Sequence, residues 1–265
     1  MRIFDNHVHL TSSSLDFFVK TFTKEGGTSI NLVNLTESCF SLDEFSKKYD
    51  ETISLGKRLR DKGLEVVVSI GPYPINYIEM KEKIGIEKTV DIYRKALDLA
   101  IKLVEEGSAN AIGEVGRPHF ETSAENMEES NSIMDYIFQM TADKDIPLIL
   151  HTESLDSSGM CELMKKARRN GKNSLVVKHF SLPIFSENCE IVPSVPAGRS
   201  NARAAPWGKA GFFLETDFAG DENNPNFVLP ADSVPKRVNM LIQEGVDQNS
   251  IEVSMNFYRE FYRLD

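Results

Sequence analysis

Short apolar runs alternate with longer amphipathic segments along most of the chain. The runs at 65–71 and 148–151 are almost continuously apolar, which is typical of strands buried on both faces. Between the runs, apolar side chains recur every three or four residues, as at 87–106, and this spacing predicts helices with one buried face. The strands predicted in this way are 2–10, 29–35, 65–71, 110–116, 148–151, 175–179, 190–195 and 211–218, and the helices are 42–62, 87–106, 123–144, 161–170, 233–244 and 247–264.

The repeated order of strand and helix predicts a single parallel (β/α)8 barrel of the TIM type over residues 1–265. A doubly wound open sheet would give a similar local pattern, but the sequence lacks the glycine-rich phosphate loop expected after the first strand of such a sheet. In a barrel, the C-terminal ends of all strands surround one mouth. We therefore expect polar residues at the strand ends to meet there.

Composition and charge narrow the class of protein. With 41% hydrophobic and 26% charged residues, the chain is typical of a globular protein rather than a disordered one. No apolar run approaches the roughly 18 residues of a membrane span, and no signal peptide is evident, so we expect a cytoplasmic protein with no membrane partner. The net charge of −10 opposes non-specific attraction to nucleic acid. Cys39, Cys161 and Cys189 lie far apart, and we expect them to be reduced.

Histidines and carboxylates gather at the predicted strand ends. His7 and His9 alternate along the first strand, so their imidazoles lie on one face and can bind a divalent metal ion. Taken alone, this pair could equally be two hydrogen-bonded core histidines. Four of the five histidines occupy strand ends, however, and this placement favours a metal site. The six candidate ligands are His7, His9, Glu114, His151, His179 and Asp217.

Six nitrogen and oxygen ligands are too many for one tetrahedral zinc ion but suit two divalent ions bridged by a carboxylate. Zinc is the first expectation, and manganese, magnesium or nickel are alternatives with the same ligand types. Two such ions lower the pKa of a shared water and polarise the bond to be cleaved. The ligand set therefore predicts a hydrolase.

Five motifs occur in an order that resembles the TatD-related branch of the metal-dependent amidohydrolase superfamily, whose members are (β/α)8 barrels known mainly as deoxyribonucleases. The resemblance extends from residue 1 to about residue 220. The motifs are Asp-Asn-His-Val-His at 5–9, Gly-Glu-Val-Gly at 113–116, His-Thr at 151–152, His179 after an apolar run, and Leu-Glu-Thr-Asp at 214–217.

The resemblance implies a role for each candidate ligand. Glu114 would bridge the two ions, and Asp217 would accept the proton of the attacking metal-bridging hydroxide and pass it to the leaving group. These two residues would therefore be catalytic. Without the resemblance, Asp217 could be a helix cap and Glu114 a salt-bridge partner. The resemblance assigns one ion to His7, His9 and Asp217 and the other to His151 and His179.

The sequence departs from the family pattern at positions near the expected substrate. Glu153 stands where the family often has arginine, and Tyr73 replaces the histidine of a Gly-x-His-Pro motif. The long segment 193–209 carries cations and the single tryptophan. These side chains could bind a phosphate and stack on a base over the mouth, or the segment could be a surface loop. The candidate substrate-binding residues are Tyr73, Arg117, His119, Glu153, Arg199, Arg203 and Trp207.

The leading prediction is a two-metal phosphodiesterase that acts as a nuclease on single-stranded DNA ends. The first alternative is an amidase, lactonase or deacylase that uses the same ions on the carbonyl carbon of a small molecule. Glu153 and the acidic net charge favour that alternative. A second alternative is a barrel that binds metal without turnover, although structural metal sites are usually closed by protein ligands.

Overall fold

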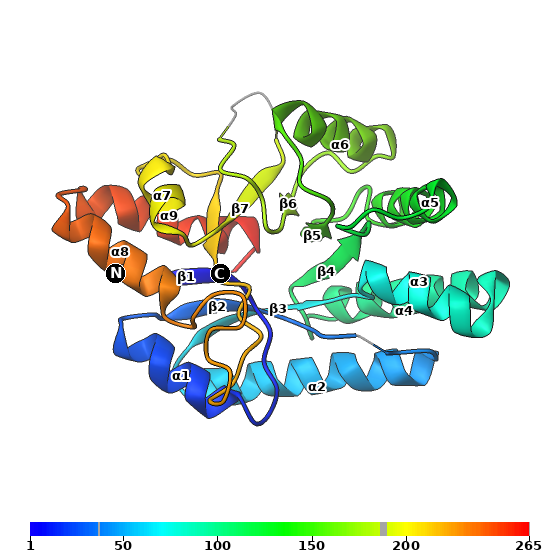
Figure 1. Ribbon diagram of the computed structural model, residues 1–265, viewed down its shortest axis with the longest axis horizontal. Helices are drawn as coiled ribbons and strands as arrows, with labels where there is room; N and C mark the ends of the chain where they lie inside the picture. The colour runs from blue at the N-terminus through cyan, green and yellow to red at the C-terminus, as the bar shows by residue number, and fades with distance from the viewer. Residues whose placement is uncertain (37, 186–189, 265) are drawn as a thin grey trace.

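Eight parallel strands form one sheet whose order follows the chain from β1 to β8 (Figure 1). The computed structural model describes residues 1–36, 38–185 and 190–264. The strands are β1 (Phe4–Val8), β2 (Ser29–Val33), β3 (Glu65–Ile70), β4 (Ala111–Gly116), β5 (Leu148–His151), β6 (Val176–Lys178), β7 (Val192–Pro196) and β8 (Phe213–Glu215). The helices are α1 (Leu15–Lys24), α2 (Leu42–Asp61), α3 (Pro74–Ile84), α4 (Ile86–Glu105), α5 (Ala124–Met140), α6 (Ser157–Arg169), α7 (Arg199–Ala204), α8 (Ser233–Gln243) and α9 (Gln248–Phe261).

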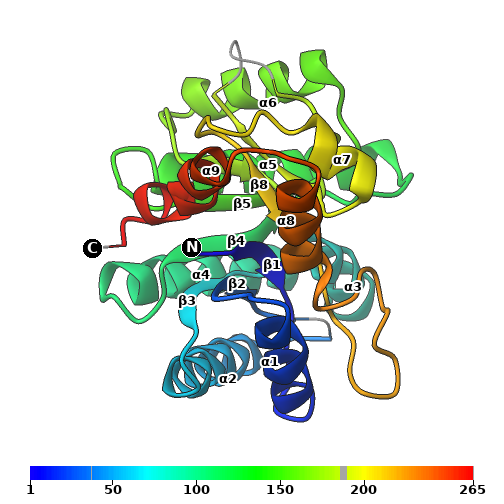
Figure 2. The same cartoon turned by 90° about the vertical axis from the view of Figure 1, so that its left-hand side faces the viewer.

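The sheet closes on itself between β1 and the segment that follows β8. Val8 forms a parallel bridge with Phe218. The backbone N–H of His9 donates to the carbonyl of Phe218 at 2.7 Å, and that of Asp217 donates to the carbonyl of His7 at 2.9 Å. The helices lie outside the strands (Figures 1 and 2). The predicted (β/α)8 barrel is therefore confirmed.

Two layers fill the barrel interior below the mouth. The lower layer is apolar, and its members come from several strands and from α9: Phe4, Val67, Ala111, Ile149, Val177, Val192, Phe213, Tyr258, Phe261 and Tyr262.

The second layer is polar, and its side chains lie further along the strands. The Tyr262 hydroxyl donates to Asn6 Oδ1 at 2.7 Å, and the Asn6 amide donates to Ser194 Oγ at 2.9 Å. Asn31 accepts from the Ser69 hydroxyl at 2.6 Å and donates to the backbone carbonyl of Asn6 at 3.0 Å. Because each of these buried polar groups has a partner, the layer links β1, β2, β3 and β7 directly beneath the strand ends.

Most predicted elements occur within a few residues of their expected bounds, but three helices lie where none was predicted. These are α1, α3 and α7. A turn was expected at 71–74, yet Pro74 is the first residue of α3, a position where proline costs no hydrogen bond. The segment 193–209, expected to be irregular, contains most of β7 and all of α7.

The cysteines differ in part from the expectation of three reduced thiols. Cys39 is free and buried, but Cys161 is disulfide-bonded, so the expectation is wrong for that residue. Spacing along the chain does not reveal which cysteines lie within bonding distance after folding. Cys189 lies outside the described residues. Among the helices that the structure describes, none has both the length and the apolar character needed to cross a membrane.

Candidate metal centre

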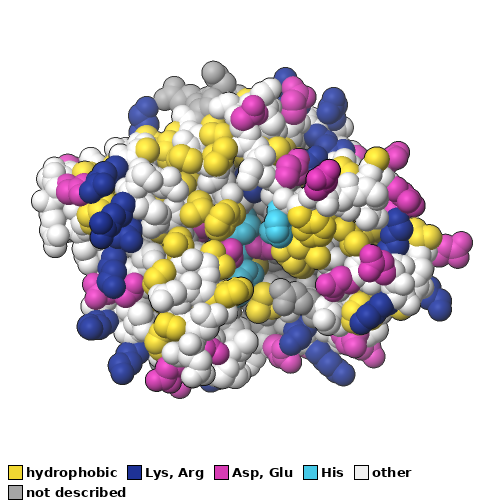
Figure 3. All heavy atoms as spheres, viewed as in Figure 1, with side chains coloured by type: hydrophobic (Ala, Val, Ile, Leu, Met, Phe, Trp, Pro, Cys, Tyr) yellow, Lys and Arg dark blue, Asp and Glu magenta, His cyan; other side chains and the backbone are white. Residues whose placement is uncertain are grey.

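The six candidate ligands meet at the C-terminal mouth of the barrel. Figure 3 shows histidine and acidic side chains around a hollow in the face seen in Figure 1. A cavity of about 390 Å³ opens there, and five of the six ligands line it. His7 lies beneath them and is completely buried. The ligands that line the cavity are His9 after β1, Glu114 in β4, His151 at the end of β5, His179 after β6 and Asp217 after β8.

Glu114 occupies the centre of the group and presents its two oxygens to different histidines. Oε1 lies 2.6 Å from His7 Nε2 and 3.3 Å from His179 Nε2. Oε2 lies 3.2 Å from His151 Nδ1. One carboxylate therefore contacts imidazoles from three strands.

The glycines around Glu114 allow β4 and β5 to approach closely. A Cβ atom on Gly113 would lie 2.5 Å from Ile149 Cβ, and one on Gly116 would lie 2.2 Å from the carbonyl oxygen of His151. Gly116 also has a φ of 138°, which side chains other than glycine rarely adopt. The Gly-Glu-Val-Gly motif thus places the carboxylate against β5.

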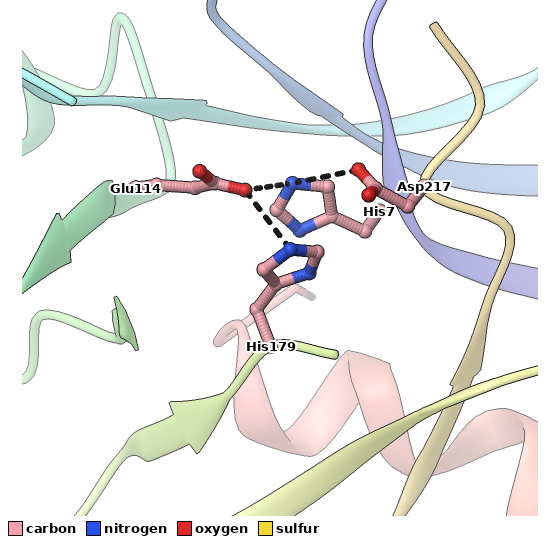
Figure 4. A group of neighbouring side chains, drawn as sticks. All are labelled: His7, Glu114, His179 and Asp217. Carbon is pink, nitrogen blue, oxygen red and sulfur yellow. Dashed lines mark ion pairs between the residues drawn. The ribbon is translucent and has the colours of Figure 1, made fainter. Parts of the chain in front are cut away.

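Asp217 approaches the other side of the group from the barrel seam. Its Oδ1 lies 3.5 Å from His9 Nε2, and the Nε2 atoms of His7 and His9 are 3.2 Å apart. Figure 4 shows Asp217, His7, Glu114 and His179 pointing toward one another. Ligand atoms of these four residues all lie within 4.8 Å of one another, so they could contact a single ion.

Groups outside the cavity orient two of the histidines. His9 Nδ1 lies 3.0 Å from the carbonyl oxygen of Val33, and His179 Nδ1 lies 3.0 Å from Glu215 Oε1. Glu215 in turn accepts hydrogen bonds from the Phe180 N–H at 2.6 Å and from the Ser194 hydroxyl at 2.5 Å. Such partners fix the ring orientation of metal-binding histidines.

Sequence reasoning gave no role to Glu215, although a carboxylate within an apolar strand is a signal of its own. Asp5 was missed in the same way. This buried carboxylate accepts from the Thr216 hydroxyl at 2.7 Å and from the Thr216 N–H at 2.9 Å. Asp5 therefore ties β1 to the residue that precedes Asp217.

The electrostatics keep the two central carboxylates ionised. Burial acts to raise the pKa of Glu114, but His179 and the other neighbouring histidines hold it well below its ordinary value. Burial likewise opposes ionisation of Asp217, and His179 and His9 lower its pKa. Burial lowers the pKa of His179 to about 4. Burial also opposes protonation of His9, but its hydrogen bond to Asp217 and the charge of Glu114 raise its pKa to about 9. Metal ions bind neutral imidazole, so an ion bound at His9 would displace that proton.

The buried donor atoms of the group fit a metal ion. Within the described ranges, His151 Nδ1, which lies 3.2 Å from Glu114 Oε2, is buried and has no hydrogen-bond partner, although buried polar atoms in folded proteins normally have one. Imidazole and carboxylate donors suit zinc and several other divalent ions. The residues present are therefore compatible with a metal centre.

The predicted substrate residues fall into two groups. Tyr73 and His119 line the cavity, and both rings lie 5.0 Å from the ring of His151. Arg117 and Glu153 are not among the residues that line the cavity. They form an ion pair with each other at 2.5 Å, so the acidic side chain that stands in place of the family's arginine has a cationic partner.

The other three predicted substrate residues are not brought to the cavity. Arg203 pairs with Glu244 after α8 at 2.5 Å. Trp207 donates to the carbonyl of Ala202 at 2.8 Å, and its ring packs against other apolar side chains. Arg199 lines a separate hollow between α7 and α8. Because α7 packs against α8, the cations of this segment lie on the outer wall of the barrel.

An apolar rim surrounds the mouth, and sequence reasoning did not identify it. Phe227 and Val228 line the cavity and are among the most exposed large apolar side chains described. Phe120 and Phe180 are also exposed, and their rings lie 5.5 Å and 5.8 Å from the rings of His119 and His179. Figure 3 shows apolar surface around the histidines. Exposed apolar groups clustered at a cavity are typical of a binding surface.

A closed parallel barrel with histidines and carboxylates gathered at its mouth defines the class of metal-dependent barrel enzymes. Residues 4–256 match the family model described as TatD related DNase. The chain therefore belongs to this family, and this membership supports a metal-dependent hydrolase.

The chain is also similar to other proteins of known sequence or structure. The chain is 26% identical over 258 residues to the uncharacterized protein MJ1127 of Methanocaldococcus jannaschii, covering 91% of this chain and 88% of that protein. The crystal structure of YjjV, a TatD homolog from Escherichia coli, aligns with a TM-score of 0.64 and 16% identity over 99% of this chain and 98% of that one. The 2,6-dihydroxybenzoate decarboxylase from Rhizobium aligns with a TM-score of 0.54 and 8% identity over 100% and 98% of the two chains. At these identities the two structures show the shared fold alone.

Proposed function

We propose that the protein is a two-metal hydrolase that cleaves phosphodiester bonds, with single-stranded DNA ends as substrate. The observation that carries this proposal is the position of Glu114, whose Oε1 lies between His7 and His179 and whose Oε2 lies beside His151. A carboxylate between two ligand sets is the arrangement expected of a bridging ligand. In this proposal His7, His9 and Asp217 hold one ion, and His151 and His179 hold the other.

The ions would supply positive charge, activate water and polarise the scissile bond. The protein residues would supply the remaining steps. Asp217, ionised beside His9, accepts the proton of the attacking water and returns it to the leaving oxygen. Glu215 and Val33 hold the rings of His179 and His9 in place.

The size and surroundings of the cavity favour binding of a single-stranded DNA end rather than a duplex. A volume of about 390 Å³ lies within the range of small-ligand sites, and the apolar rim of Phe227 and Phe180 suits stacking of unpaired bases. Arg117 neutralises Glu153, which reduces the repulsion of a phosphate.

The test is cleavage of a short labelled single-stranded DNA by metal-reconstituted protein. Asp217→Asn should reduce cleavage by about 10²- to 10⁴-fold, the usual contribution of a general acid and base. The metal content of both proteins is measured alongside, so that lost chemistry is distinguished from lost metal. Full activity in Asp217→Asn would refute the role of Asp217, and no cleavage by the metal-loaded parent would refute the phosphodiester assignment.

A second candidate function, hydrolysis of a carbonyl compound, is favoured by the cavity lining. Neither lysine nor arginine is among the described residues that line it, and a phosphodiester commonly has a cationic side chain as a partner. An amide, ester or lactone carries no charge at the reacting group. A panel of lactones, esters and N-acyl compounds, assayed with the same metal-loaded protein, distinguishes the two functions.

A further inference from the structure

His119, predicted above to bind substrate, stands against a candidate metal ligand, and the proposed reaction gives it no role. Its Nδ1 lies 2.8 Å from His151 Nε2. His151 Nδ1, on the other side of the same ring, lies 3.2 Å from Glu114 Oε2 and is buried without a hydrogen bond to any described residue. The nitrogen that faces the metal centre is therefore Nδ1, and the nitrogen that faces His119 is the remote one.

The loop that carries His119 is fixed to the barrel on both sides. The backbone N–H of Arg117 donates to the carbonyl of His151 at 2.8 Å. The Arg117 side chain contacts Glu153 after β5 at 2.5 Å and Asn131 in α5 at 3.2 Å. Pro118, which follows Arg117 and precedes His119 in the chain, is buried. Arg117 thus ties the loop to β5 and α5 two residues before His119.

Another candidate ligand has an acceptor at the same relative place. His9 directs its remote nitrogen at the carbonyl of Val33 at 3.0 Å, and the remote nitrogen of His179 lies 3.0 Å from Glu215 Oε1 without the geometry of a hydrogen bond. A neutral imidazole carries one proton, so a remote nitrogen that donates leaves the other nitrogen with a free lone pair. His119 Nδ1, 2.8 Å from the remote nitrogen of His151, stands where such an acceptor is needed.

We propose that His119 is a positioning residue for metal binding: it accepts a hydrogen bond from His151 Nε2 and thereby directs the Nδ1 lone pair of His151 toward the ion beside Glu114. This inference rests on the metal binding in the proposed function and not on the identity of its substrate.

The experiment measures metal binding without any substrate. Metal-free protein is titrated with Co²⁺, the visible absorption of the bound ion is recorded, and the number of ions bound per chain is determined by elemental analysis. The variants are His119→Ala, which removes the acceptor, and His119→Asn, whose side-chain oxygen can accept in place of Nδ1. Glu121→Gln, in the same exposed stretch of loop, is the matched control. Thermal unfolding of each metal-free variant establishes that the barrel remains folded.

His119→Ala should weaken binding of one ion by about 10- to 100-fold, the usual effect of losing such a partner, and should alter the Co²⁺ spectrum. His119→Asn should restore most of the affinity, and Glu121→Gln should match the parent. Unchanged affinity and spectrum in His119→Ala would overturn the inference, as would equal losses in the Ala and Asn variants. If the parent binds two ions but hydrolyses no phosphodiester, the proposed function fails while this inference stands.

Discussion

Replacing Glu215 with glutamine should strengthen the metal-free fold and weaken metal binding. Glu215 is completely buried, and its two oxygens contact the Phe180 N–H, the Ser194 hydroxyl and His179 Nδ1. Glutamine has nearly the same shape and keeps a carbonyl oxygen that can accept from Phe180. The substitution therefore removes the negative charge and leaves most of the packing unchanged.

The size of the stability effect follows from the pKa of the carboxyl group. Burial raises the pKa of Glu215 from 4.5 to about 7, a shift worth about 3 kcal/mol. Because the folded state holds the proton more tightly than the unfolded chain, the parent loses stability as pH rises from about 4.5 to about 7, and the cost is fully present above that range. Glu215→Gln lacks this cost. Without metal, the variant should be more stable than the parent by up to about 3 kcal/mol at pH 8 and equally stable at pH 4.

Metal affinity should change in the opposite direction. The carboxylate lies 3.0 Å from the remote nitrogen of His179, and losing an outer partner of a metal-binding histidine typically lowers metal affinity by about 10- to 100-fold. Urea unfolding of metal-free protein at pH 4 and pH 8, together with Zn²⁺ titration calorimetry, measures both effects. Glu215→Ala is the control, because it leaves Phe180 and Ser194 without an acceptor and should destabilise the fold at both pH values. A glutamine variant that is less stable than the parent at pH 8, or that binds zinc equally well, would refute the reasoning.

Two further substitutions test the geometry of the mouth. Gly116→Ala places a Cβ within 2.2 Å of the His151 carbonyl oxygen at a φ of 138°. The free energy of unfolding, measured by thermal unfolding, should therefore fall by about 2–4 kcal/mol, and zinc occupancy should fall with it. A melting curve like that of the parent would contradict the close approach. Phe227→Ala removes apolar surface beside the cavity and should raise the KM for the cleaved substrate by about 10-fold, the equivalent of 1–2 kcal/mol of lost contact, while kcat and metal content stay the same. An unchanged KM would exclude the rim from substrate binding.

The sequence was sufficient for the barrel because buried parallel strands have a strong local pattern. The runs at 65–71 and 148–151 match β3 and β5 closely. The meeting of His7, Glu114 and Asp217 could also be predicted, since all strand ends of a barrel surround one mouth. The local sequence pattern was enough to predict this meeting, because in a parallel barrel a residue at the C-terminal end of any strand lies at the mouth.

The remaining features depend on contacts between distant residues. Arg203 lies on the outer wall because it pairs with Glu244, 41 positions away, and no local pattern indicates that partner. Glu215 acquires its role only when β6 and β8 place His179 beside it. The apolar rim combines loops that follow β4, β6 and β8, and exposed phenylalanines in loops carry no periodicity to identify them. Helix α1 was missed because its phenylalanines, valine and threonines also favour strands.

The seam between β1 and the segment that follows β8 joins the first and last strands of the sheet, and their separation along the chain affects the order of folding. Asp5 and Thr216, which bond across the seam, are 211 positions apart, so closing it requires one of the longest loops that the chain can form. The candidate ligands His7, His9 and Asp217 flank this closure on both sides. A cation that binds only when both sides are present stabilises the closed barrel by mass action. The metal concentration would then set the fraction of molecules in which the seam is closed. Removal of the metal by a chelator should make β1 susceptible to proteolysis before the central strands of the barrel.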